Sequence, residues 1–186
     1  MKIAILATVL CACWWAAEFI RSSLQDRISY ADWDKGSSKF WDVAHSFGVV
    51  GVIVGFTGSG HVRPGENFIA ATGFFLMVVG IGVRYLAIHT LRKYFTGKVR
   101  ILEDHRLVRS GLYQHVRHPG YAGALVAHFG FGLTFSSWLS LLLIFCPVVL
   151  AALYRMQIEE EALKDAFGQE YLDYMKRTRR LLPGIY

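Results

Sequence analysis

The chain has 186 residues, of which 54% are hydrophobic and only 18% are charged, with a net charge of +6. Soluble domains usually carry about 25% charged residues, and the apolar residues here come in long blocks, so the composition favours a single-domain membrane protein. The basic residues lie beside those blocks, as juxtamembrane cations do, which makes the charge weak evidence for a nucleic-acid partner, and we expect none.

In chain order, the apolar blocks predict about five transmembrane helices, at residues 3–20, 42–58, 68–88, 121–134 and 138–154. A hydrocarbon core of ~30 Å requires ~20 apolar residues, so the fourth block is short. The first block has an alternative, because Lys2 precedes it and residues 10–13 vaguely resemble a lipoprotein cleavage box: it is either a retained span or a cleaved signal.

Two features suggest how these spans pack. Gly51 and Gly55 form a small-xxx-small pair, which either admits a neighbouring helix or reflects glycine tolerated in lipid. Arg84, near the end of the third span, either snorkels to the interface or faces the protein interior. Only residues 135–137 separate the last two spans, which predicts a helical hairpin whose outer ends meet on one side.

Basic residues set the expected orientation. Residues 21–40, 91–117 and 155–186 are rich in Lys and Arg, whereas the loop at 59–67 holds only Arg63. Five spans with the N-terminus outside place every basic segment in the cytoplasm. We therefore expect an all-α integral membrane protein forming one domain, 1–186. Its parts are three spans (1–90), a cytosolic cofactor loop (91–120), the helical hairpin (121–154) and a cytosolic tail (155–186) that is helical until Pro183 and Gly184.

The stretch "HRLVRSGLYQHVRHPGYAG", residues 105–123, stands at the mouth of the hairpin. His118 followed by Pro119 predicts a helix start, and the free N–H groups there suit a carboxylate. Gly111 and Gly120 permit close backbone approach to a ligand. The seven His show no metal-ligand spacing, so we expect no metal. Taken alone, His118 is more typical of a capping or interfacial residue.

The tail offers a second group of candidates. Arg155 and Glu159 share a helix face, either as an i, i+4 ion pair or as two groups that point at different parts of a ligand. We expect Glu160 and Glu161 to be ordinary solvated residues. Phe167, Tyr171 and Tyr174 form an aromatic stripe, which is more often packing than a binding surface.

Taken together, these motifs have a specific resemblance. "HRLVRSGLYQHVRHPGYAG", an apolar hairpin and then "R…EEE…FGQEYLDYMKRTRRLLP" strongly resemble the isoprenylcysteine carboxyl methyltransferase family, and the preceding "RYLAIHTLRKYFTGKV" looks like its bacterial members. The resemblance covers roughly residues 84–183. It implies a membrane methyltransferase that uses S-adenosyl-L-methionine.

The resemblance also implies site residues. Arg155 would be catalytic and lie near the substrate carboxylate, and Glu159 would be catalytic and bind the cofactor. The eukaryotic members have a Gln ahead of the block where Lys98 stands here, so that contact is not carried over. The cofactor-binding residues would be His105, Arg106, Leu107, Val108, Tyr113, His118, Pro119, Gly120, Tyr121 and Glu159.

The chemistry fits this resemblance. A carboxylate acceptor has a pKa near ~4, so it is ionised at neutral pH and needs no general base, and alignment can contribute ~7–11 kcal/mol. An apolar substrate would enter from the bilayer while the cofactor enters from the cytoplasm. The methyl acceptor and the oligomeric state stay open. The alternatives are a phospholipid-amine or small-thiol methyltransferase, an NADPH-dependent sterol-type reductase, and a non-enzymatic membrane scaffold.

Overall fold

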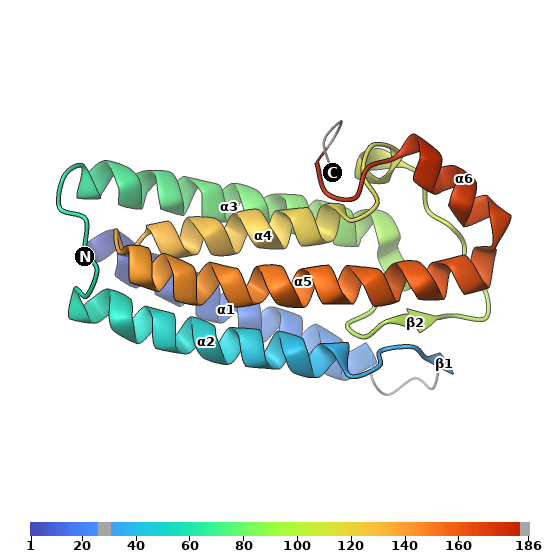
Figure 1. Cartoon of the computed structure of the whole chain (residues 1–186), viewed down its shortest axis with the longest axis horizontal. Helices are drawn as coiled ribbons and strands as arrows, with labels where there is room; N and C mark the ends of the chain where they lie inside the picture. Colours follow the sequence, from blue (N-terminus) through green and yellow to red (C-terminus); the bar gives the residue numbers. More distant parts are fainter. Residues whose placement is uncertain (26–30, 183–186) are drawn as a thin grey trace.

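The computed structural model describes residues 1–25 and 31–182 and is almost entirely helical. Five long helices lie side by side as a bundle, and a short sixth helix crosses one end (Figure 1). Two two-residue strands, β1 and β2, pair antiparallel at that same end, with Ala31 opposite Ile101. The helices are α1 (Lys2–Gln25), α2 (Ser37–Thr57), α3 (Glu66–Leu91), α4 (Pro119–Leu133), α5 (Trp138–Phe167) and α6 (Gln169–Arg177); the strands are β1 (Ala31–Asp32) and β2 (Arg100–Ile101); two 3₁₀ turns are η1 (Arg92–Tyr94) and η2 (Gly111–Gln114).

All five predicted apolar blocks form helices, and four of these, α1, α2, α3 and α5, are long and apolar enough to cross a membrane. The remaining helix, α4, has 15 residues and is therefore about 22 Å long, shorter than a hydrocarbon core of ~30 Å. The class of integral membrane protein is confirmed, while the count of five spans stays a prediction.

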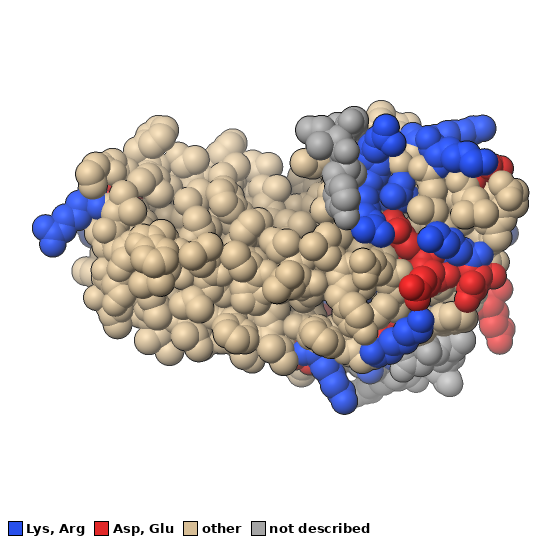
Figure 2. Space-filling model, viewed as in Figure 1, with Lys and Arg blue, Asp and Glu red and all other residues tan. Residues whose placement is uncertain are grey.

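The outer surface of the bundle is apolar. Phe75 on α3 and Leu150 on α5 are 65% and 68% exposed, and similar side chains cover α1 and α2. On the face shown in Figure 2, Lys, Arg, Asp and Glu gather at the end that carries α6, and almost none lies over the long helices. Such a surface would be costly in water but suits a bilayer.

The predicted hairpin is formed by α4 and α5, and its turn is fixed at the end of the bundle away from α6 (Figure 1). The Ser137 hydroxyl caps α5 by accepting a hydrogen bond from the Ser140 N–H at 3.2 Å. The Val62 N–H donates to the Ser136 carbonyl at 2.7 Å, which ties the loop between α2 and α3 to this turn.

The tail differs in part from the prediction. Helix α5 continues through residue 155 as far as Phe167, so Arg155 and Glu159 lie on a direct extension of the last long helix. The break comes at Gly168, where φ is +50°, and α6 then ends at Arg177. Pro183 and Gly184, the expected helix stop, lie outside the described residues.

Glycines allow the helices to pack closely. A Cβ placed on Gly51 or Gly55 would collide with the hairpin, at Ile144 and Phe135 respectively, so the small-xxx-small pair does face a neighbouring helix. Helices α3 and α4 approach even more closely, because a Cβ on Gly80 would meet the backbone of Gly123 and Ala127. This packing fixes the position of α4, and with it the His118–Tyr121 turn at its start.

The polar segments converge at one end of the bundle. The Trp33 N–H, before α2, donates to the Val99 carbonyl, after α3, at 3.1 Å. Lys35 forms an ion pair with Glu161 on α5 at 2.8 Å. Segments from three widely separated parts of the sequence therefore surround the mouth of the hairpin.

Candidate active site

A cavity of about 750 Å³ opens at the polar end and extends between α1 and α2. This volume is within the range of small-molecule sites, about 300–1,000 Å³. Pro119 is the predicted site residue that does not line it; Pro119 is buried as the first residue of α4. The predicted residues that do line it are His105, Arg106, Leu107, Val108, Tyr113, His118, Gly120, Tyr121, Arg155 and Glu159, and Lys98 lines it as well.

Tyr121 connects the two candidates from α5. Its hydroxyl donates to Oε2 of Glu159 at 3.0 Å and accepts from Nε of Arg155 at 3.1 Å. Arg155 and Glu159 are thus joined through the hydroxyl. Among the described residues, none bonds to Oε1 of Glu159, so that oxygen remains available to a ligand.

Arg155 is buried and firmly held. Its Nη1 donates to Oδ1 of Asp34 and to the Ser37 hydroxyl, both at 3.3 Å, and its Nη2 donates to the Gly97 carbonyl. Since each Nη carries two hydrogens, Nη2 retains one for a ligand. The guanidinium therefore joins the segment before α2, the segment after α3, and α4, and it can present one further donor to the cavity.

Asp34 was not identified from the sequence. It accepts from the Ser37 hydroxyl at 2.8 Å and from the Ser38 N–H at 2.9 Å, at the start of α2. Burial alone would raise the pKa of Asp34, but these hydrogen bonds and the Arg155 charge outweigh burial, so its pKa lies below the ordinary value. The available signal was an Asp three residues before a Ser at a helix start, which is typical of capping and does not indicate a buried partner for Arg155.

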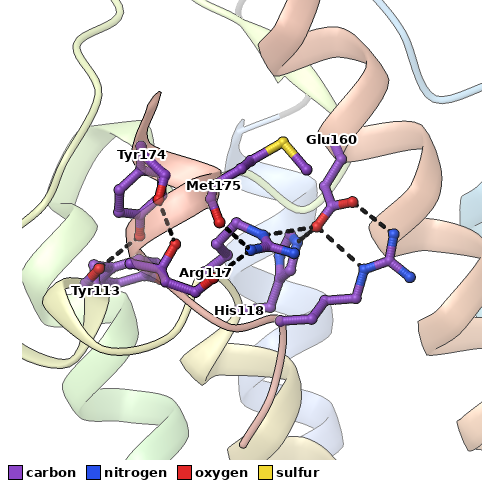
Figure 3. A network of polar contacts seen from close by, with 8 residues as sticks. Tyr113, Arg117, His118, Glu160, Tyr174 and Met175 are labelled. Carbon is purple, nitrogen blue, oxygen red and sulfur yellow. Dashed lines mark hydrogen bonds and ion pairs between the residues drawn. The ribbon is translucent and has the colours of Figure 1, made fainter. Parts of the chain in front are cut away.

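The expectation that Glu160 is solvated is wrong. It is 3% exposed and lies between two arginines and His118 (Figure 3). Oε1 accepts from Nε of Arg117 at 3.0 Å, from Nε2 of His118 at 3.2 Å and from Nε of Arg180 at 3.1 Å. Its neighbour Glu161 is exposed, as expected. Helical periodicity could not show which of Glu160 and Glu161 is buried, because the face of α5 that is covered depends on how the C-terminal segment folds back.

That C-terminal segment pairs with the block before α4. The Arg117 N–H donates to the Arg179 carbonyl at 2.7 Å, and the His118 N–H donates to the Arg180 carbonyl at 3.1 Å. The Tyr174 hydroxyl donates to the Tyr113 carbonyl at 2.6 Å, so the aromatic stripe does pack (Figure 3). The segment after α6 thus holds the backbone of His118 in place, and Tyr171 and Tyr174 of α6 line one side of the cavity.

His105 belongs to an aromatic wall. Its ring stacks on Tyr94 with centroids 5.0 Å apart and meets Phe167 edge-on at 5.6 Å. Burial lowers the pKa of His105, so the ring is neutral at neutral pH. A neutral ring among aromatic groups suits a flat, uncharged ligand moiety such as a nucleobase.

Arg84 faces the protein interior, the second of the two expected possibilities. Its Nε and Nη2 donate to the two oxygens of Glu18 on α1, at 2.7 and 3.1 Å. Its Nη1 donates to the Gly120 carbonyl at 3.3 Å. This pair links α1 to the first turn of α4. Farther from the polar end, aromatic side chains such as Trp14, Trp15 and Trp41 line the cavity.

The residues present fit a cationic nucleoside cofactor. Oε1 of Glu159, which has no partner among the described residues, is an acceptor for a ribose hydroxyl or an ammonium group, and the ring of His105 is a stacking surface for a base. Within the part of the chain that the structure describes, the buried hydroxyl of Tyr171, whose side chain lines the cavity, has no hydrogen-bond partner. Within residues 1–25 and 31–182, no group of three His, Cys, Asp or Glu side chains lies close enough to hold a metal ion.

Comparison with known proteins agrees with this geometry. The model of the isoprenylcysteine carboxyl methyltransferase (ICMT) family matches residues 72–165, about half of the chain. A probable protein-S-isoprenylcysteine O-methyltransferase of Oryza sativa subsp. indica is 32% identical over 63% of this chain and 63% of its own length. The protein-S-isoprenylcysteine O-methyltransferase of Mus musculus is 35% identical over 64% of this chain and 43% of its own length.

A solved structure has a similar fold. The eukaryotic intramembrane Ras methyltransferase ICMT superposes with a TM-score of 0.61 at 25% identity, covering 78% of this chain and 52% of that chain. The present chain therefore spans between about two fifths and two thirds of the length of these relatives.

Proposed function

This chain belongs to the isoprenylcysteine carboxyl methyltransferase family, and we propose that it is an S-adenosyl-L-methionine-dependent membrane methyltransferase whose acceptor is the carboxylate of a lipophilic, isoprenylcysteine-like substrate. The observation that carries this proposal is one cavity that joins two environments. Glu159, Tyr121 and Arg155 line its polar end, and α1 and α2 add the aromatic and apolar side chains of Trp14, Trp15, Phe19, Trp41 and Val49.

The cofactor would be held at the polar end. We assign the adenine to the wall that His105 forms with Tyr94, beside Tyr113, and the ammonium or ribose to the available oxygen of Glu159. Residues 106–108 and the turn at His118 and Gly120 line the adjoining surface. When bound, S-adenosyl-L-methionine would supply an electrophilic methyl group, and the C–S electron pair would remain on sulfur.

The acceptor carboxylate would approach Arg155. It is ionised at neutral pH, so no side chain has to remove a proton, and the nucleophile is ready without a general base. The remaining N–H of Arg155 can orient one carboxylate oxygen and leave the other to react. Because Asp34 and Tyr121 fix the guanidinium, this donor is positioned before the substrate binds, which reduces the entropy lost on alignment.

Orientation and entry follow from the same arrangement. We assign the polar end to the cytoplasm because Lys and Arg gather there. Cytoplasmic segments of membrane proteins carry an excess of these residues. The polar cofactor would then enter from water. The lipophilic acceptor, a prenylated molecule, would enter from the bilayer between α1 and α2.

Ligand titration of the purified chain tests this proposal. S-adenosylhomocysteine should bind, and Glu159→Gln should weaken its binding at least tenfold, since a charge-assisted contact contributes about 1.5–3 kcal/mol. Glu161→Gln, one residue later and exposed, is the control and should bind as the wild type does. Binding of NADPH in place of S-adenosylhomocysteine would favour the reductase alternative and overturn the proposal.

A further inference from the structure

The cavity ends in a cluster of five ring side chains that the proposed methyl transfer does not use. We call this the inner cluster; it consists of Trp14, Trp15, Trp41, His45 and His128, all of which line the cavity. Tyr121 and His128 are seven residues apart on α4, so they lie on one helix face about 10 Å apart along its axis. The inner cluster is therefore about two helical turns deeper than the proposed reaction site.

The rings contact one another closely. The centroid of His128 lies 5.1 Å from that of Trp14 and 5.7 Å from that of His45. His45 also meets Trp15 edge-on at 4.6 Å and Trp41 at 5.6 Å. A purely hydrocarbon ligand chain offers no hydrogen-bond partner to an imidazole nitrogen or an indole N–H, so two imidazoles and three indoles call for a separate explanation.

The tautomer of each His follows from its backbone contact. Nδ1 of His128 lies 2.8 Å from the Ala124 carbonyl, and Nδ1 of His45 lies 2.9 Å from the Trp41 carbonyl. A carbonyl oxygen only accepts, so each Nδ1 carries the hydrogen. A charged imidazolium would be costly among these apolar rings, so each ring is neutral and its Nε2 has a free lone pair.

Among the residues that the structure describes, three polar atoms of the inner cluster have no hydrogen-bond partner. Nε2 of His128 is buried and accepts no hydrogen bond, and Nε1 of Trp14 and Nε1 of Trp15 are buried and donate none. His128 is 1% exposed. Leaving such groups unsatisfied costs about 1–3 kcal/mol each, and here an acceptor and two donors belong to side chains that line the same cavity.

We propose that the inner cluster recognises a hydroxyl group carried on the apolar chain of the methyl acceptor, about 10 Å from its reacting carboxylate. This rests on the proposed function for the reaction, but it narrows the substrate class from any lipophilic carboxylate to a chain-hydroxylated one. A hydroxyl both donates and accepts. It can donate to Nε2 of His128 and accept from an indole N–H, which a hydrocarbon chain cannot do.

A pair of acceptors that differ in one atom tests this. The full chain in lipid nanodiscs is given a saturating methyl donor and an S-prenylated N-acetylcysteine, either unmodified or with one hydroxyl about 10 Å along the prenyl chain. We expect the hydroxylated acceptor to have about a tenfold higher kcat/KM, the ratio that one satisfied buried hydrogen bond gives. His128→Phe and Trp15→Phe should each reduce the ratio toward one.

Trp138→Phe is the matched control, because Trp138 is exposed and lies at the far end of α5, outside the cavity. It should keep the wild-type ratio. If the wild type has the same kcat/KM for the two acceptors, the inference is overturned. A water trapped at the inner cluster would give this result. A preference that survives in both His128→Phe and Trp15→Phe overturns it too.

Binding separates this inference from the proposed function. Both acceptors are also titrated without turnover, by quenching of tryptophan fluorescence. If neither is methylated but the hydroxylated one binds about tenfold more tightly, the proposed function fails and the hydroxyl site stands. If both are methylated and bind equally, the function stands and the hydroxyl site is wrong.

Discussion

The Tyr121 hydroxyl donates a hydrogen bond to Glu159 at 3.0 Å across the mouth of the α4–α5 hairpin. The same oxygen accepts from Nε of Arg155 at 3.1 Å, so one hydroxyl holds the two charged groups of the site in fixed relation. In the sequence these residues lie in two separate motifs more than 30 residues apart, and the hairpin brings them together.

Tyr121→Phe should therefore lower kcat/KM for methyl transfer by about ten- to a hundredfold, since two hydrogen bonds to charged groups are lost. The wall of the cavity keeps its shape, so the melting temperature in detergent should change little. Tyr154→Phe, also a tyrosine at the polar end but largely outside the cavity, should retain wild-type kinetics. Equal kcat/KM for both variants would remove Tyr121 from the site.

Glu160→Gln should destabilise the protein, because Arg117, His118 and Arg180 would lose their shared carboxylate. Removing one partner from a buried charge network costs about 3–5 kcal/mol. Thermal unfolding in detergent measures this, and the exposed Glu161→Gln provides the comparison at the adjacent position. If both variants unfold at the same temperature, the network does not hold the C-terminal segment against α5.

Close packing of α3 against α4 can be tested with two glycines on one helix. A Cβ at Gly80 would collide with the α4 backbone, whereas one at Gly82 would meet nothing within 4 Å. Gly80→Ala should lower the free energy of unfolding by about 1–3 kcal/mol, as overpacking typically does, and should therefore lower the unfolding temperature. Gly82→Ala should be neutral or stabilising, because alanine is the better helix former.

The pH dependence of stability should report His105. Burial lowers its pKa in the folded protein, so between that pKa and the unfolded value near ~6.5 the unfolded chain binds more protons. The contribution of His105 to stability is thus complete above about pH 6.5 and is lost as the pH falls below it. His105→Phe keeps an aromatic ring beside Tyr94 but does not titrate.

The unfolding temperatures of wild type and His105→Phe, measured from pH 8 to pH 5, isolate this effect from that of the other His. The wild type should lose more stability than the variant on acidification. Parallel curves would show that His105 is not held in its neutral form by folding.

The sequence predicted the features that depend on local pattern. Long apolar blocks gave five helices, His118 and Pro119 gave the start of α4, and the three-residue break gave the hairpin. Once the hairpin is assumed, its outer ends must meet, so the convergence of the 105–121 block with Glu159 could be expected. Ten of the eleven predicted site residues line one cavity for this reason; Pro119 does not, because its ring packs into the first turn of the helix.

Features that depend on the return of distant segments were not predictable. Asp34 reads as an ordinary residue before a helix, and it becomes the partner of Arg155 only because β1 and β2 pair beside α5. Glu160 reads as solvated, and it is buried only because residues 178–180 fold back onto the block before α4. Neither contact follows from the periodic side-chain pattern of a helix or a strand, so the sequence pattern could not reveal it.

Transfer of a tritiated methyl group tests the central claim most directly. Purified protein is incubated with S-prenylated N-acetylcysteine and methyl-labelled S-adenosyl-L-methionine, and the lipid product is then treated with mild base. We predict that the acceptor gains label, that mild base releases it as volatile methanol, and that Arg155→Ala reduces the transfer to background. Label that resists base would point to methylation of an amine or a thiol, and it would contradict the assignment of this cavity to a carboxylate acceptor.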